Sequence, residues 1–130
     1  MAHLSFEYTA NLEGKADLAK FCELMCKVMN DSNIFPQGGI RVRGTKVDVH
    51  SVGNGDPHFA FVDIKLRMGQ GRNSQIREAV GNSIYAAAET WFREKLGPSP
   101  FALSLEVFEI KKRFSIKSYN NLHEYVITNT

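Results

Sequence analysis

Hydrophobic and polar residues alternate from the start of the chain, in the stretch MAHLSFEY. Leu4, Phe6 and Tyr8 fall on one side of an extended segment, and polar residues fall on the other. This alternation predicts a β-strand over residues 3–9 with one buried face. The chain is therefore expected to enter a sheet almost at its first residue.

A helix is predicted over residues 15–30, because apolar residues there are three and four positions apart. This stripe consists of Leu18, Phe21, Cys22, Met25, Val28 and Met29. The run NDSN ends the helix, and residues 34–52 are predicted to be extended, with a bend at the proline and glycines near their start. A turn is predicted at 53–57, where GNGDP contains Asn-Gly and Asp-Pro.

The same order of elements then repeats. The strand HFAFVDIKLRMG has a single apolar face made of Ala60, Val62, Ile64, Leu66 and Met68. A helix over 74–96, capped by Asn73 or Ser74 and ended by Gly97-Pro98, has an apolar stripe of Ile76, Val80, Ile84, Ala87 and Trp91. The last strand, FALSLEVFEI, precedes a tail that contains Leu122, Tyr125, Val126 and Ile127.

Two β-α-β units predict an α+β fold, in which a β-α-β-β-α-β chain forms a four-stranded mixed sheet with two helices on one face. No linker divides the halves, so residues 1–130 are expected to form a single domain.

The face of the predicted sheet away from the helices is then uncovered. Apolar residues expected there are Phe59, Phe61, Phe108 and Ile110. Such a face usually has a partner, so we expect an oligomer packed sheet to sheet, with sites enclosed between subunits.

Charge and hydropathy exclude several classes of partner. A formal net charge of +2 is too small to indicate nucleic acid, and the basic run Lys111-Lys112-Arg113 is typical of a solvated strand end. No stretch approaches the ~20 apolar residues of a membrane span, and the start of the chain does not resemble a signal peptide. We therefore expect a cytoplasmic protein that binds neither nucleic acid nor membrane.

The cysteines and histidines do not indicate a metal site. Cys22 and Cys26 share a helix face without further ligands nearby in sequence, which favours reduced thiols in the core. The histidines are scattered, at His3, His50, His58 and His123. No Ser-His-Asp constellation and no phosphate-binding lysine motif is present either.

Three groups are candidates for chemistry, and the first two are arginine sites. Arg41 and Arg43 in GGIRVRG lie on one face of a strand, either as a solvated face or as a ligand site. Arg72 in GQGRNS lies where a strand ends in a glycine-rich bend before a helix, which indicates either an anion site or a plain turn.

The third candidate is the α-amine at the start of the first strand. Ala2 is small, so Met1 should be removed and the nitrogen of Ala2 becomes the terminus. An α-amine has a pKa of about 7.7–8.0, which burial near arginines lowers, so that a neutral base is present at working pH. Arginines that bind carboxylates would orient an organic acid and stabilise an enolate beside this base. The three groups together suggest enol–keto chemistry.

The chain resembles the 5-carboxymethyl-2-hydroxymuconate delta-isomerases of the tautomerase superfamily over nearly its whole length. The stretches that carry the resemblance are AHLSFEY, NIFPQGGIRVR, the VDV after it, FAFVDIKLRMGQGRN and ALSLEVFEI. The resemblance implies the β-α-β-β-α-β fold, a homotrimer, no cofactor, and interconversion of an unsaturated hydroxy di- or tricarboxylic acid with its keto isomer.

Residue by residue, the resemblance places the family's substrate-binding arginines on Arg41 and Arg72. The family's base is an N-terminal proline, and Ala2 stands at its position. A primary amine still accepts a proton but lacks the ring, and it forms an imine with a keto acid more readily. Retention of Met1 would move the amine by roughly 3.3 Å along the strand. Two alternatives therefore stay open: a trimeric carboxylic-acid-binding protein without turnover, and a tautomerase-fold enzyme with shifted chemistry.

Overall fold

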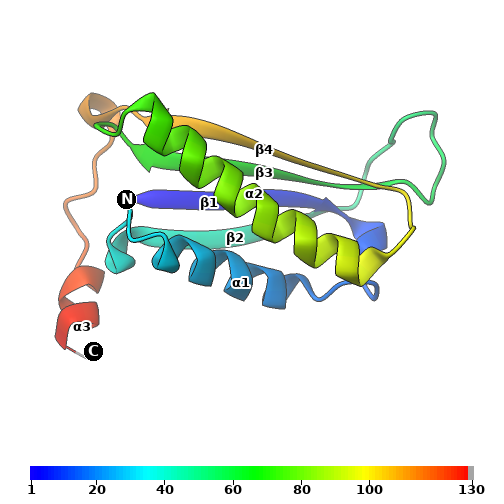
Figure 1. The fold of residues 1–130 in the computed structure, drawn as a ribbon, viewed down its shortest axis with the longest axis horizontal. Helices are drawn as coiled ribbons and strands as arrows, with labels where there is room; N and C mark the ends of the chain where they lie inside the picture. Colours follow the sequence, from blue (N-terminus) through cyan, green and yellow to red (C-terminus); the bar gives the residue numbers. More distant parts are fainter. Residues whose placement is uncertain (129–130) are drawn as a thin grey trace.

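Four strands form one mixed sheet in the computed structural model, which describes residues 1–128 (Figure 1). In sheet order they are β2 (Ile40–Val47), β1 (Ala2–Thr9), β3 (Ala60–Gly69) and β4 (Phe101–Ile110). β1 runs parallel to β2 and antiparallel to β3, and β4 runs parallel to β3. The helices α1 (Leu18–Asp31) and α2 (Ser74–Leu96) cross the same face of the sheet. The predicted β-α-β-β-α-β fold is confirmed.

The core lies between this sheet face and the two helices. Leu4 pairs with Leu66 and Phe6 with Ile64 across β1 and β3, and all four side chains are buried. The apolar alternation in the sequence therefore corresponds to the helix-covered face of the two central strands. Each such side chain contributes about 1.5–3 kcal/mol of burial free energy, which fixes the register of β1 against β3.

Capping side chains set where both helices begin. Asp17 accepts a hydrogen bond from the backbone N–H of Lys20 (3.2 Å), so α1 begins at Leu18, three residues after the predicted start. The side chain of Asn73 accepts a hydrogen bond from the N–H of Ile76 (2.8 Å) and caps α2. Asn73 was one of the two predicted caps.

The buried stripe of α2 differs from the predicted one. Ile76 is 41% exposed and Trp91 is only partly buried. The predicted Val80 and Ile84 are buried, and Ala87 is partly buried against the core. The other buried apolar residues are Ala88, Phe92 and Leu96, which were not predicted. Phe92 packs on Phe21 and Phe101, with ring centroids 4.7 and 4.9 Å apart. Packing of these rings selects the face of the helix, because several stripes in this alanine-rich sequence have helical spacing.

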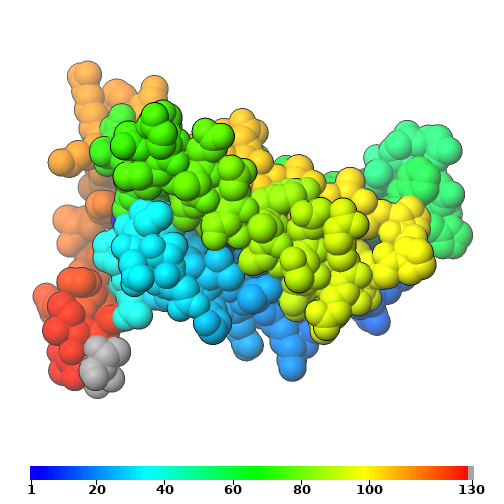
Figure 2. Space-filling view, in the orientation of Figure 1, coloured from blue at the N-terminus to red at the C-terminus, as the bar shows by residue number. Residues whose placement is uncertain are grey.

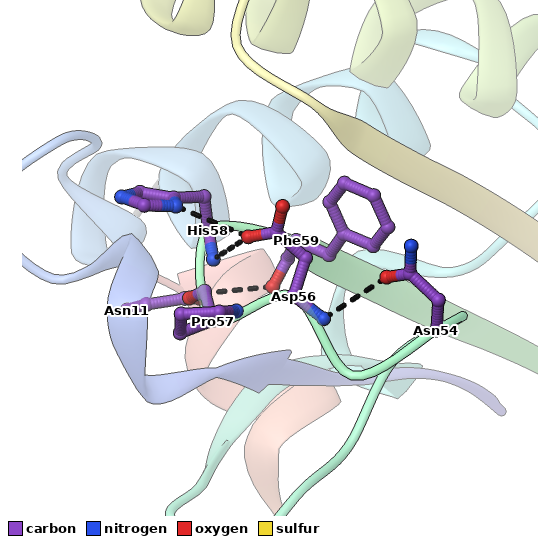
Figure 3. Close-up of polar contacts among 6 residues, drawn as sticks. All are labelled: Asn11, Asn54, Asp56, Pro57, His58 and Phe59. Atoms are coloured by element: carbon purple, nitrogen blue, oxygen red, sulfur yellow. Dashed lines mark hydrogen bonds and ion pairs between the residues drawn. The ribbon is translucent and has the colours of Figure 1, made fainter.

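The predicted extended run over 34–52 is shorter in the structure. A 3-10 turn, η2 (Gln37–Gly39), precedes β2, and residues 48–59 form a loop at the end of the sheet opposite the N-terminus (Figure 1). The side-chain amide of Asn11 donates hydrogen bonds to the carbonyls of Pro57 (3.2 Å) and Phe59 (2.8 Å), which fixes the end of this loop (Figure 3). The predicted turn at 53–57 lies within it.

The sheet face away from the helices carries both charged and apolar side chains. His3 on β1 stands opposite Arg41 on β2 and Arg67 on β3. Phe61, Phe108 and Ile110 fall on this face by strand alternation, whereas Phe59 precedes β3 and packs against Gly53. The face predicted from four apolar residues is therefore more polar than expected.

The tail forms two short helices that the sequence pattern did not predict. They are η3 (Lys112–Phe114) and α3 (Leu122–Thr128). α3 lies against the η2 region in Figure 2, where the red and cyan atoms touch at one end of the molecule. Among residues 1–128, no helix has the length and apolar content needed to cross a membrane.

Candidate active site

Three chain segments meet at the N-terminal end of β1. Ala2 is fully buried and pairs with Ile40 at the start of β2 and with Met68 near the end of β3. The turn η2 and the bend after β3 therefore flank the amino terminus. The N–H of Gly69 donates a hydrogen bond to the carbonyl of Met1 (3.2 Å). The fold thus puts a primary amine beside the two sequence regions that contain the candidate arginines.

The guanidinium group of Arg72 is held by the backbone of both flanking regions. It donates hydrogen bonds to the carbonyls of Gly69 (3.1 Å) and Ile34 (2.9 Å). Its Cζ lies 5.1 Å from the centre of the Phe35 ring. A guanidinium group has five N–H donors in a rigid fork, so donors remain for an anion after these two bonds. Arg72 is therefore positioned before any ligand arrives.

Arg41 and Arg43 have different surroundings, although they share a strand face. Arg41 is half-buried, and its Nη1 lies 3.4 Å from the carbonyl of Gly39, next to the N-terminal end of β1. Arg43 is exposed, and its Nη1 lies 3.1 Å from Nδ1 of His3. Since arginine can only donate, Nδ1 is the acceptor and the imidazole is neutral in this contact.

Burial and positive charge shift the titration of both groups at this end of β1. Burial lowers the pKa of the Met1 α-amine below its ordinary value of 8.0, and the charges of Lys117, Arg72 and Arg41 lower it further, in that order. Burial, followed by Arg67, Arg43 and Arg41, lowers the pKa of His3 to about 4. The structure therefore brings the amine, Arg41 and Arg72 together, whereas Arg43 acts on His3.

Two pockets border the amino terminus. The first, of about 250 Å³, is formed by Met1, Pro36, Gly38, Gly39, Lys117, Asn120 and His123. The second, of about 240 Å³, is formed by Met1, Gly69, Gln70, Arg72, Ile110, Lys112, Ser115 and Lys117. Met1 and Lys117 border both pockets, and neither wall contains a carboxylate among the described residues. Such a site attracts anions.

Lys117 was missed by the sequence reasoning. It belongs to the tail, about 45 residues along the chain from Arg72, and no motif surrounds it. Only the path of the chain after β4 brings it to the amine. Elsewhere among residues 1–128, no three His, Cys, Asp or Glu side chains are grouped as a metal site would require.

The family model described as 5-carboxymethyl-2-hydroxymuconate isomerase matches residues 2–126. The chain belongs to this family. The 5-carboxymethyl-2-hydroxymuconate Delta-isomerase of Escherichia coli is 29% identical over 123 residues, which cover 95% of this chain and 97% of that protein. The resemblance carried by AHLSFEY and the arginine-containing stretches is thus confirmed at the level of the family.

Solved structures of other proteins share the fold of this chain. A 5-carboxymethyl-2-hydroxymuconate isomerase from Deinococcus radiodurans R1 is 28% identical, with a TM-score of 0.87 over 96% of this chain and 93% of that one. A second 5-carboxymethyl-2-hydroxymuconate delta-isomerase is 23% identical, with a TM-score of 0.86 over 97% and 93%. A protein described as a fused 4-OT symmetric trimer shares the fold at 19% identity, with a TM-score of 0.64 over 89% and 93%.

Proposed function

We propose that this protein is a tautomerase that interconverts the enol and keto forms of 5-carboxymethyl-2-hydroxymuconate or a closely similar acid. The α-amine of Ala2 is the base in this proposal, and Arg41 and Arg72 bind the substrate, without a cofactor. The observation that carries it is that Arg41 and Arg72 both lie near the amino terminus of β1. The two pockets beside this terminus have no carboxylate among their described lining residues. Membership of an isomerase family supports the reaction class.

Met1 occupies the position in which this proposal places the substrate. Its carbonyl accepts a hydrogen bond from the N–H of Gly69, and the residue borders both pockets. Each pocket alone is smaller than the roughly 300 Å³ of a typical small-ligand site. Because Met1 lines both pockets, we expect its removal to enlarge the cavity beside the terminus. Removal also frees the Gly69 N–H to donate to an anion. The new terminus at Ala2 then borders the enlarged cavity.

The reaction needs only proton movement in this site. The neutral amine accepts the proton of the substrate's 2-hydroxyl group, and the O–H electron pair forms the carbonyl. A proton is then added to a carbon of the conjugated chain, so atoms and charge balance without an oxidant or reductant. Arg41 and Arg72 stabilise the carboxylates and the enolate charge.

A binding protein without turnover is the second candidate, and the residue at position 2 favours it. The resemblance assigns the base to a proline ring, whereas Ala2 provides an unconstrained primary amine. An amine of this kind also condenses with keto acids, which is the basis of a third candidate, a tautomerase-fold enzyme with shifted chemistry.

The pH dependence of turnover tests the proposal directly. The base is active when neutral, so kcat/KM for ketonisation should rise with pH as the amine loses its proton and then level off. Burial and the charges of Lys117, Arg72 and Arg41 lower the pKa of the Met1 amine from its ordinary value of 8.0. The Ala2 amine would lie near the same cations, so the rise should be centred below pH 8.0. The measurement uses protein whose intact mass shows loss of Met1. Absence of turnover at every pH, with the acid still bound, would support the binding protein instead.

We further propose that the protein is a homotrimer associated through the uncovered sheet face. Phe61, Phe108 and Ile110 provide apolar contacts on this face, and the family resemblance implies three subunits. Sedimentation equilibrium at micromolar concentration should report a mass about three times the 14.6 kDa of the chain. A monomer under these conditions would contradict the sheet-to-sheet interface and any site shared between subunits.

A further inference from the structure

The chain after β4 crosses the site between two fixed points. At one end, the backbone N–H of Lys112 donates a hydrogen bond to Oε1 of Gln70 (2.8 Å), next to the Arg72 turn. At the other end, α3 packs on η2 so closely that a Cβ atom at Gly38 would lie 2.7 Å from the backbone of His123. Figure 1 shows this segment, in orange and red, passing the end of β1 marked N. We refer to residues 111–128 as the C-terminal segment.

Lys117 lies between these two fixed points and faces the amino terminus. Together with Met1 it borders both pockets, whereas Lys112 borders only one. Its side chain is exposed and has no carboxylate partner among residues 1–128. An unpaired ammonium group at the junction of two pockets is available to an anionic ligand.

The electrostatics agree with this placement. After burial, which is the main cause of the lowered amine pKa, the charge of Lys117 has a larger effect than that of Arg72 or Arg41. Coulombic effects of this kind fall with distance, so this order is consistent with a Lys117 ammonium group close to the amino terminus.

We propose that Lys117 is a specificity-determining residue that binds an additional carboxylate of the substrate. Arg41 and Arg72 suffice for a dicarboxylate, whereas 5-carboxymethyl-2-hydroxymuconate has three carboxylates. Lys117 binds the third carboxylate, so the C-terminal segment selects tricarboxylic over dicarboxylic acids. The identity of the acids rests on the proposed function, but the preference for a third carboxylate rests on the position of Lys117.

The experiment compares Lys117→Ala with wild type on 5-carboxymethyl-2-hydroxymuconate and on 2-hydroxymuconate, which lacks the third carboxylate. The KM for the tricarboxylate should rise about tenfold, as expected for loss of a charge-assisted contact, while its kcat changes little. The KM for the dicarboxylate should stay within about twofold, since Lys117 makes no contact with it. Lys117→Arg should restore most of the preference. Lys20→Ala, an exposed lysine on α1, is the matched background variant.

Calorimetric binding of the saturated acids tricarballylate and glutarate separates this proposal from the proposed function. If wild type turns over neither substrate, the proposed isomerase activity fails, and the binding data still test Lys117. Tricarballylate binding about tenfold weaker in Lys117→Ala than in wild type, with unchanged glutarate binding, supports the proposal. Equal losses for both acids, or the same loss in Lys112→Ala, would overturn it and indicate a general basic surface.

Gly38→Ala tests whether docking of the C-terminal segment positions Lys117. An added Cβ displaces the backbone of His123 and hence α3. This variant should lose the same tricarboxylate preference, and the double variant with Lys117→Ala should be no worse than Lys117→Ala alone. Additive losses in the double variant would show that the segment does not act through Lys117.

Discussion

Replacing Ala2 with proline is expected to raise the kcat for ketonisation of 5-carboxymethyl-2-hydroxymuconate by roughly ten- to a hundredfold. This is less than the ~10²–10⁴-fold of a complete general base, because the primary amine of Ala2 already supplies part of that catalysis. The substitution restores the ring amine that the resemblance assigns to this position. A proline is compatible with the first position of a strand. Because Arg41 and Arg72 are unchanged, KM should change little, and steady-state kinetics will separate the two parameters.

The matched control is the same polypeptide with and without Met1. Protein that retains Met1 can be prepared and then treated with methionine aminopeptidase in vitro, with each form identified by intact mass. Retention shifts the amine by about one residue and leaves Met1 between the two pockets, so activity should be at least a hundredfold lower. If Ala2→Pro and wild type were equally inert after complete removal of Met1, the amine would have no catalytic role.

Replacing either Arg72 or Arg41 with alanine is expected to weaken binding of a dicarboxylate such as 2-hydroxymuconate by roughly 1.5–3 kcal/mol. Arg72→Ala should have the larger total effect, because Arg72 also bonds to the carbonyls of Ile34 and Gly69 and joins the two turns of the site. Arg72→Lys should not restore binding, since an ammonium group lacks the planar fork that makes these bonds together. Isothermal titration calorimetry measures the binding, and a thermal melt measures the accompanying loss of stability.

Arg43→Ala is the matched control for this pair. Arg43 lies on the same strand face as Arg41 but contacts His3, and its charge is not among those that lower the amine pKa. Its replacement should therefore leave dicarboxylate binding nearly unchanged. Equal, small losses in all three arginine variants would identify a solvated basic face and contradict the assignment of Arg41 and Arg72.

The sequence by itself determined the order of the elements and the core of the sheet. Leu4 and Phe6 on β1, with Ile64 and Leu66 on β3, alternate with polar residues, and only one register buries all four. The motifs around Arg41 and Arg72 also predicted a bend before the second strand and a bend after the third. Local rules sufficed because strand alternation and helix capping depend on residues close together in the chain.

The tertiary structure decided everything that depends on contacts between distant segments. The aromatic contacts of Phe92 selected the buried face of α2, which helical spacing alone left open. Arg41 and Arg43 look equivalent in the sequence. Only the pairing of β2 with β1 shows that Arg43 is the one whose side chain contacts His3. Lys117 has no motif, and it reaches the amine because Gln70 and Gly38 hold the C-terminal segment across the site. The third cation of this site is therefore a product of chain path, which periodicity and short motifs do not encode.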